Sequence, residues 1–363
     1  MQNDGDLSST AKLSTGKMDE VNGQARQNVQ NSSAQHKSIA ATDRGQVLII
    51  GEALLDCFAD TMVPGGAPFN VARTLGAFGM APHLITRIGK DSAGGQLLDQ
   101  FRRFRLPTDG VQLDDARTTG MVTVKSGAAG HTFTIGLDAA WDAIDPATAA
   151  ALAQSLSPSI ICFGTLAQRA PTSRAAVAAV LEKTTALRVL DLNLRPTADH
   201  KDIAAWSLHH ADVVKVNDGE LAQLLTWFVP TFGPAAQAWG SIQQLRAIEA
   251  LGGIFSWRNL VVTRGADGYA AFDSRGKLIA FGDAPHTTVI DTVGAGDGFL
   301  AILILGEILG WPFPQSLLRA SHFAAGVCTF RGAVADDLAF YQQWATQWDT
   351  SITGEPFTTT RTA

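Results

Sequence analysis

Cysteine is scarce in this sequence of 363 residues. The three that occur, Cys57, Cys162 and Cys328, lie far apart and lack the spacing of a metal site. This pattern argues against the disulfide framework of a small secreted protein and suits a reducing compartment. We therefore expect the protein to be cytoplasmic.

Long apolar runs and an excess of positive charge are also missing. The longest apolar run covers 299–305, far short of the roughly 20 residues that cross a bilayer. The net charge is −6 and the pI is about 5.7, so the chain has no global basic field for nucleic acid or an acidic membrane. We expect a small molecule as the partner, with neither nucleic acid nor membrane.

Aromatic residues are absent from residues 1–44, which are rich in Ser, Gln, Asn and Lys. Such a segment cannot bury enough apolar surface to offset the entropy lost on ordering, so we expect a disordered N-terminal tail. Residues 351–363 are expected to form a second loose tail. The segment between them, residues 45–350, is predicted to form one domain, since the chain is 46% hydrophobic and can build a full core.

Short apolar runs alternate with helical patterns through this domain. The runs typical of buried strands cover 47–50, 83–89, 159–164, 187–193, 211–217 and 259–263. The alternation predicts an α/β fold with a mainly parallel sheet covered by helices on both faces. The final third is predicted to be helical at 297–309, 315–330 and about 337–348.

Two segments depart from this alternation. Residues 118–136 read as two strands joined by a glycine-rich turn, a hairpin that we interpret as a small lid. A second hairpin is predicted at 269–281.

The stretch IDTVGAGDGFLAILILGEIL, residues 290–309, places glycines and an aspartate directly before an apolar segment. Gly294 and Gly296 lack a Cβ, so the backbone there can approach a ligand closely. We expect a helix that opens at Asp297, whose first N–H groups and dipole favour an anion such as phosphate. Asp297 is then placed to accept a proton from an attacking hydroxyl. The alternative is that Asp297 only caps the helix and the glycines form an ordinary loop.

Other nucleotide-binding signatures are missing. No GxxxxGK[ST] motif occurs, which argues against a P-loop. The GAGDGF run is not a GxGxxG motif after a strand at the start of the chain, so a dinucleotide-binding dehydrogenase is not expected.

Several further motifs place polar residues beside predicted strands and helices. In PGGAPFNVARTLGAFG, residues 64–79, a glycine loop enters a helix that has a face of small residues. Asp56 follows the first strand, at the edge where open parallel sheets bind ligands. In LDLNLRP, residues 190–196, Asp191, Asn193 and Arg195 alternate with leucines and would share one strand face. Each pattern also has a purely structural interpretation. These are a glycine turn before a core helix for the first, a solvent-exposed loop acid for Asp56 and a solvent-facing side of a strand for the third.

Two motifs follow later strands. Asn217 and Glu220 have the spacing of a capping box at the start of a helix. VVTRGADG, residues 261–268, is a strand followed by a glycine turn, a weak signal when taken alone.

Together, and in this order, the motifs resemble those of the ribokinase-like (PfkB-type) carbohydrate kinases. The resemblance covers roughly residues 46–345 and rests on GExLxD, GGxxxN, DxNxRP, NxxE, TxGxxG and DTxGAGD strings. It implies a three-layer αβα fold with a small β lid and an ATP-dependent sugar kinase that uses Mg²⁺. The resemblance also makes a K⁺ requirement plausible.

The resemblance also implies a role for each matching residue. Asp297 would be the general base, and Gly294, Ala295 and Gly296 the anion hole. The sugar or transferring phosphate would be contacted by Asp56, Gly65, Gly66, Asn70, Asn193 and Arg195. The nucleotide would be contacted by Asn217, Glu220, Thr263, Gly265 and Gly268. Glu220 would act on Mg²⁺ through water, and Asp291 would lie at a monovalent-cation site. The family often has Asn about where Ser321 or His322 stands, which leaves the adenine contact open.

GEALLD, GGAPFNVA and DLNLRP favour the fructokinase branch. Within the family, 2-keto-3-deoxygluconate is the alternative substrate. An alternative from another class is a catalytically silent sugar- or nucleotide-binding protein. Residues 59–63 form a shorter connection than is usual in fructokinases, so we expect a reduced lid that rests on the 118–136 hairpin. The oligomeric state is left open, including a homodimer.

Overall fold

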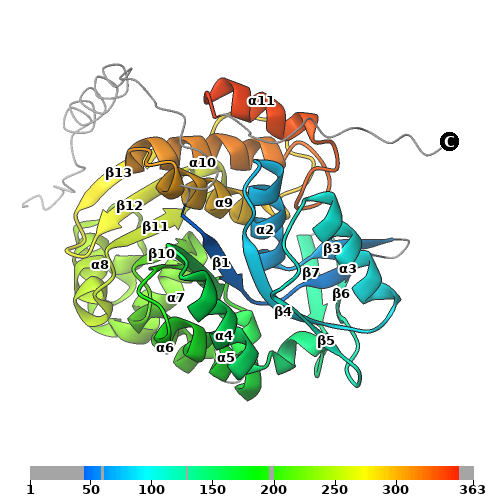
Figure 1. Cartoon of the computed structure of the whole chain (residues 1–363). Coiled ribbons are helices and arrows are strands. Elements are labelled where there is room, and N and C mark those ends of the chain that lie inside the picture. Colours follow the sequence, from blue (N-terminus) through cyan, green and yellow to red (C-terminus); the bar gives the residue numbers. More distant parts are fainter. Residues whose placement is uncertain (1–44, 59–60, 128–129, 196–199, 351–363) are drawn as a thin grey trace, which may run out of the picture. The chain divides into compact units, whose positions relative to one another are not determined.

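The computed structural model describes residues 45–58, 61–127, 130–195 and 200–350, which belong to one compact unit. The tails expected at 1–44 and 351–363 lie outside the described residues. Within the described part of the chain, nine strands form one large sheet (Figure 1). In order across the sheet, they are β13 (Leu278–Gly282), β12 (Tyr269–Asp273), β11 (Asn259–Thr263), β10 (Val213–Asn217), β9 (Leu187–Asp191), β8 (Ile160–Gly164), β1 (Val47–Ile50), β4 (His83–Gly89) and β5 (Val111–Asp114).

The pairing in this sheet is parallel from β5 through β11, whereas β12 and β13 add an antiparallel hairpin at one edge. The mainly parallel sheet and the second hairpin are therefore confirmed. β5 is a strand that the sequence did not predict.

Helices cover both faces of the sheet. One face carries α2 (Ala67–Ala77), α3 (Ser92–Arg103), α9 (Ala295–Ile308), α10 (Phe313–Val327) and α11 (Ala339–Gln347). The opposite face carries α4 (Pro146–Leu156), α5 (Pro171–Glu182), α6 (His200–His209), α7 (Asp218–Phe228) and α8 (Ile242–Phe255). Short 3₁₀ turns are η2 (Ala140–Ala143), η3 (Leu166–Arg169), η4 (Pro230–Phe232), η5 (Pro234–Gln237) and η6 (Gly265–Asp267).

The continuous apolar runs are explained by these two helical layers. Successive side chains of a strand point to opposite faces, so a strand covered on both faces needs apolar residues throughout. In β1, Val47 and Ile49 join the core under α2 and α9, while Leu48 and Ile50 join the core under α4 and α5. The three-layer α/β/α arrangement predicted from the sequence is confirmed.

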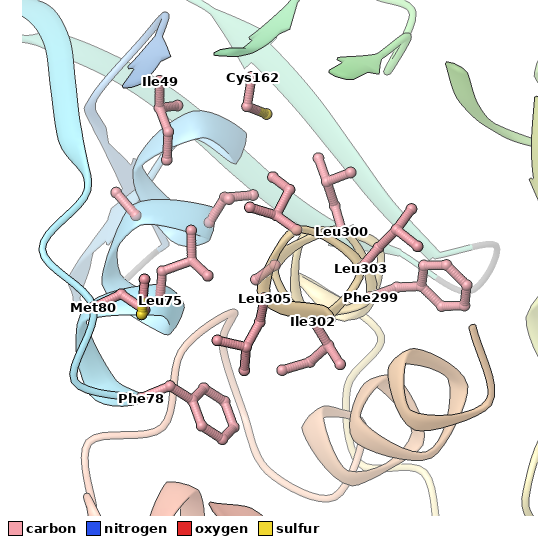
Figure 2. Close-up of a cluster of buried hydrophobic side chains, with 14 of the residues drawn as sticks. Ile49, Leu75, Phe78, Met80, Cys162, Phe299, Leu300, Ile302, Leu303 and Leu305 are labelled. Atoms are coloured by element: carbon pink, nitrogen blue, oxygen red, sulfur yellow. The ribbon is translucent and has the colours of Figure 1, made fainter. Parts of the chain in front are cut away.

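Helix α9 is apolar on all sides and is buried, as expected of a helix in the core of a large domain. Its residues 298–306 are all buried. Figure 2 shows Leu300 and Leu303 pointing toward the sheet and Leu305 pointing toward α2. The helix begins at Ala295, two residues earlier than predicted, because Gly294 adopts a left-handed conformation that starts the first turn. This packing places the glycine–aspartate turn beside Lys215 of the central strand β10.

A second, smaller sheet forms the lid. In the described residues its strand order is β3 (Met62–Gly65), β2 (Leu54–Cys57), β6 (Gly120–Gly127) and β7 (Gly130–Ile135). The predicted hairpin corresponds to β6 and β7. The expected lid hairpin is extended by two further strands on either side of the short 59–63 connection, since β2 pairs with both β3 and β6. Among the described residues the lid sheet therefore has four strands.

In the part of the chain that the structure describes, every helix is too short or too polar to span a membrane.

Candidate active site

The glycine–aspartate turn lies at the N-terminus of α9. Gly294 has a φ of +78°, and a Cβ there would lie 2.3 Å from Cα of Ala333, so the position requires glycine. Ala295, Gly296 and Asp297 are the first three residues of the helix rather than a loop before it. The positive end of the helix dipole and the first N–H groups therefore converge where Asp297 is placed.

Asn70 and Asp297 meet at this point. Asn70 is buried in α2, and its side-chain amide Nδ2 donates to Asp297 Oδ2 across 2.6 Å. The GGAPFN and GAGD motifs, more than 200 residues apart in the sequence, are thereby joined. This contact arises because α2 and α9 belong to the same helical layer (Figure 1).

The surroundings of Asp297 raise the pKa of its carboxyl to about 6. Withdrawal from water is the main cause, and the negative charge of Asp191 adds to it. The Asn70 hydrogen bond and the positive charges of Lys215 and Arg195 act in the opposite direction. A carboxylate with such a pKa is a better proton acceptor than an ordinary aspartate and is still ionised at neutral pH.

Asp56 and Gly65 face each other in the lid. Asp56 lies in β2 and Gly65 at the end of β3, where a Cβ would stand 2.1 Å from Asp56 Oδ2. Only glycine leaves room for the carboxylate there. Burial, followed by the charge of Asp297, raises the pKa of Asp56 to about 6. The two carboxyls therefore share one electrostatic environment.

Glu52 is a site residue that the sequence reasoning missed. It is 4% exposed, and burial raises its pKa to about 7. It accepts a hydrogen bond from the backbone N–H of Ala67 and so supports the start of α2 after Gly66, whose φ is +101°. An acid directly after a buried strand was the available signal. Glu52 also lines a small recess with Thr165, Asp191, Asn193 and Leu300.

The segment after β9 differs from the prediction. The strand ends at Asp191, and Asn193 has a φ of +38°, so Asp191, Asn193 and Arg195 do not share one continuous strand face. The left-handed turn instead points the chain out of the sheet. Arg195 nevertheless lies near the acidic residues, since its charge lowers the pKa values of Glu52, Asp56 and Asp297.

A buried ion pair beneath α9 was also missed. Lys215 Nζ in β10 donates to Asp191 Oδ1 across 2.8 Å, and each side chain is 7% exposed. Lys215 Nζ also lies 3.3 Å from the position that a Cβ on Gly296 would occupy. A positive charge is therefore packed against the first turn of α9. The signal was a lysine inside the apolar run VVKVN.

The predicted capping box is present at the start of α7. Asn217 Oδ1 accepts from the Glu220 N–H at 2.8 Å, and Glu220 Oε2 accepts from the Asn217 N–H at 2.9 Å. Glu220 Oε1 also accepts from the Leu194 N–H at 2.8 Å, which ties the β9 turn to α7. Burial, followed by the charge of Asp191, raises the pKa of Glu220.

Thr263 lies beside Asn217 in the sheet, since the two residues are partners in the register of β10 and β11. Gly265 and Gly268 follow with φ values of +54° and +85°. A Cβ on Gly268 would lie 2.0 Å from the Gly282 carbonyl oxygen, so glycine is required there. The structure therefore brings together the residues that the family resemblance assigned to the nucleotide, at the ends of the neighbouring strands β10 and β11.

Asp291 holds two loops together. Its oxygens accept from the N–H groups of Val293 at 3.1 Å and Gly332 at 3.0 Å. On α10, Ser321 is buried and His322 is half-buried, and burial lowers the pKa of His322. Among the described residues, no cluster of three or more His, Cys, Asp or Glu side chains could hold a metal ion.

Comparison with known sequences gives consistent matches. Residues 41–338 match the family model for pfkB family carbohydrate kinases. The chain is 26% identical to a fructokinase of Klebsiella pneumoniae, over 82% of this chain and 91% of that protein. It is 28% identical to a fructokinase of Salmonella typhimurium, over 80% of this chain and 92% of that protein.

Comparison with solved structures agrees. A fructokinase from Vibrio cholerae, in a fructose-, ADP- and calcium-bound form, has a TM-score of 0.66 at 22% identity, with 82% of this chain and 98% of that chain covered. Aminoimidazole riboside kinase from Salmonella enterica, complexed with aminoimidazole riboside and an ATP analog, has a TM-score of 0.65 at 22% identity, with 83% and 99% covered. These likenesses confirm the ribokinase-like fold.

Proposed function

The chain belongs to the pfkB family of carbohydrate kinases, and we propose that it transfers the γ-phosphate of ATP to fructose. Membership of this family makes it a phosphotransferase that acts on a sugar hydroxyl. Fructose is favoured by the GEALLD, GGAPFNVA and DLNLRP motifs and by the fructokinases among its relatives.

The observation that carries this proposal is the Asn70–Asp297 contact at the first turn of α9. This contact supports the proposal because a buried carboxyl, a side-chain amide and the positive end of a helix come together there, which suits a proton acceptor beside a sugar hydroxyl and a phosphate. Asp56 and Arg195 contribute to the same electrostatic environment. This is the arrangement needed to bring a neutral hydroxyl and a phosphate together.

In the proposed reaction, Asp297 accepts the proton of a primary sugar hydroxyl. The hydroxyl oxygen attacks the γ-phosphorus in line, a new phosphorus–oxygen bond forms, and the bond to the β-phosphate oxygen breaks to release ADP. The N–H groups of Ala295 and Gly296 would bind the transferring phosphoryl oxygens. Lys215, packed against Gly296, adds positive charge beneath them.

The residues on the nucleotide side fit a metal–nucleotide complex. Glu220 accepts one backbone hydrogen bond on each carboxylate oxygen, which leaves lone pairs on both for a metal-bound water. We propose Mg²⁺ there, where it would neutralise phosphate charge, and K⁺ beside Asp291. Thr263, Gly265 and Gly268 would border the nucleotide.

A sugar acid such as 2-keto-3-deoxygluconate is the second candidate substrate. Arg195 lines a small recess together with His200 and Thr165. An arginine in such a position can bind a carboxylate through two parallel hydrogen bonds. Fructose has no carboxylate and so could not form this pair of hydrogen bonds with Arg195.

The test is ADP release from ATP and Mg²⁺ by the purified protein with fructose, 2-keto-3-deoxygluconate, ribose, tagatose, adenosine or no sugar. We expect fructose to give the strongest stimulation. Preference for 2-keto-3-deoxygluconate would replace the substrate, and Arg195→Met should then raise the KM of that sugar acid. Equal release with and without each sugar would contradict the proposed activity.

A further inference from the structure

Arg73 is a buried arginine in α2, one helical turn after Asn70. It is 4% exposed, and its guanidinium lies over the Phe69 ring, 4.8 Å from the centroid. Its Nη2 donates to Asn70 Oδ1 at 2.6 Å and to the Pro64 carbonyl at 2.7 Å. Arg73 falls within the stretch PGGAPFNVARTLGAFG, but no role was predicted for it from the sequence.

The contact with Asn70 determines which way the amide points. An asparagine side chain has an acceptor oxygen and a donor nitrogen that can exchange places by a half-turn. A guanidinium can only donate, so it must face Oδ1. Nδ2 is then left to donate to Asp297, the geometry observed at 2.6 Å. With the amide reversed, both contacts would be repulsive.

The contact with Pro64 connects the same guanidinium to the lid. Pro64 lies in β3, where it pairs with Leu55 of β2, next to Asp56. Arg73 therefore joins the lid strand that precedes the Gly65–Gly66 turn to the amide beside Asp297. One side chain relates the position of the lid to the position of the base.

Burial of this charge is unfavourable and therefore lowers the pKa of Arg73 to about 10. The carboxylates of Asp336, Asp297 and Asp56 partly balance the charge. Packing alone does not require a cation here, since the aromatic neighbours would accept an apolar side chain of similar length. A role in the site accounts for the charge better than a role in the core does.

We propose that Arg73 is a positioning residue for phosphoryl transfer: it fixes the orientation of the Asn70 amide toward Asp297 and couples that orientation to lid strand β3. The inference rests on the proposed function for the role of Asp297. The orientation of the Asn70 amide can be tested independently of the proposed function.

The test is a double-mutant cycle of Arg73→Met and Asn70→Ala, measured as kcat/KM for the preferred sugar. We expect Arg73→Met to lower kcat/KM by about 10- to 100-fold in the parent, since small misplacements of reacting groups cost about this much. In the Asn70→Ala background it should lower kcat/KM by less than about threefold, because the amide it orients is absent. Equal losses in both backgrounds would overturn the proposal.

Arg73→Lys retains the charge and serves as a second variant if the methionine does not fold. Its smaller loss should likewise disappear in the Asn70→Ala background. Arg87→Met is the matched control, because Arg87 pairs with buried Asp114 at 2.7 Å on the β4–β5 edge. We expect Arg87→Met to lower the melting temperature. It should change kcat/KM by the same factor in the parent and in the Asn70→Ala background.

A spectroscopic measurement separates this inference from the proposed function. In protein labelled with ¹⁵N-asparagine, the side-chain NH₂ signals of Asn70 are identified by their loss in Asn70→Ala. We expect one of these protons to be shifted downfield by Asp297, and both Arg73→Met and Asp297→Asn to remove that shift. Unchanged signals in Arg73→Met would overturn the positioning role even in a protein with full kinase activity. Absence of sugar-stimulated ADP release with a normal NMR result would contradict the proposed function alone.

Discussion

Lys215 Nζ lies 2.8 Å from Asp191 Oδ1 and is packed against Gly296, the second residue of α9. The pair is buried between the sheet and the helix that carries Asp297. Both charges act on Asp297, with Asp191 raising its pKa and Lys215 lowering it. The ion pair therefore tunes the pKa of Asp297, although only Asp191 lies in a predicted motif and Lys215 does not.

The kinase activity of the unsubstituted protein, the parent of the variants below, should depend on pH. Asp297 must be ionised to accept a proton, and its pKa is raised from 3.8 to about 6. Because the pKa is raised, activity should be lost as the pH falls through about 6 and should be nearly full above pH 7. Initial rates at limiting sugar concentration between about pH 5 and pH 9 measure this acidic limb of the pH–activity profile. A limb near pH 4 would contradict the buried environment of Asp297.

The ion pair should shift this limb in opposite directions. Asp191→Asn removes a negative charge and should move the limb to lower pH, whereas Lys215→Met should move it to higher pH. Each single substitution should also cost about 3–5 kcal/mol of unfolding free energy, because it leaves a buried charge without its partner. Urea titration and the pH profile measure the two effects. Shifts in the same direction for both variants would refute this electrostatic account.

Asp297→Asn tests the base directly. Asparagine keeps the size of the side chain but cannot accept the hydroxyl proton, so kcat should fall by about 10²–10⁴-fold. The melting temperature should change little or rise, since a partly desolvated charge is removed. Asp283→Asn, an exposed residue outside the site, is the control. If kcat of Asp297→Asn stays within about tenfold of the parent, another group is the base.

Glu52 should make stability depend on pH. Its pKa is raised from 4.5 to about 7, so the folded state holds a proton that the unfolded state releases. Stability should therefore fall as the pH rises from about 4.5 to about 7, by about 3 kcal/mol for this group. Glu52→Gln should remove that share and make the protein more stable at pH 8. Chemical unfolding at several pH values measures it, and parallel curves for parent and variant would contradict the assignment.

The two glycines before Asp297 should respond differently to alanine. At Gly294 an added Cβ would lie 2.3 Å from Cα of Ala333, and φ is +78°, so Gly294→Ala should cost at least about 1–3 kcal/mol of stability. At Gly296 a Cβ would meet Lys215 Nζ at 3.3 Å, a flexible end that can move. Gly296→Ala should keep the melting temperature and lower kcat or raise the KM for ATP. An unchanged kcat and KM in Gly296→Ala would argue against a phosphate site there.

The sequence alone determined the layers of this protein. Apolar runs such as 47–50 can be buried only between two helical layers, because their side chains point to both faces. Local rules were also sufficient for the capping box of Asn217 and Glu220, whose contacts span a single helical turn. The candidate site residues were predicted from the motifs and their order along the chain. Both can be read from the sequence without knowing which residues are in contact.

Only the tertiary structure determined the contacts that tune the site. The Asn70–Asp297 hydrogen bond, the Asp191–Lys215 pair and the Arg73 contact with Pro64 depend on how separate elements pack. The left-handed conformation of Asn193 and the pairing of β2 with β3 and β6 likewise depend on neighbouring strands. Burial and the distances between charges set pKa values, and both are properties of the packed chain, which no local pattern of residues contains.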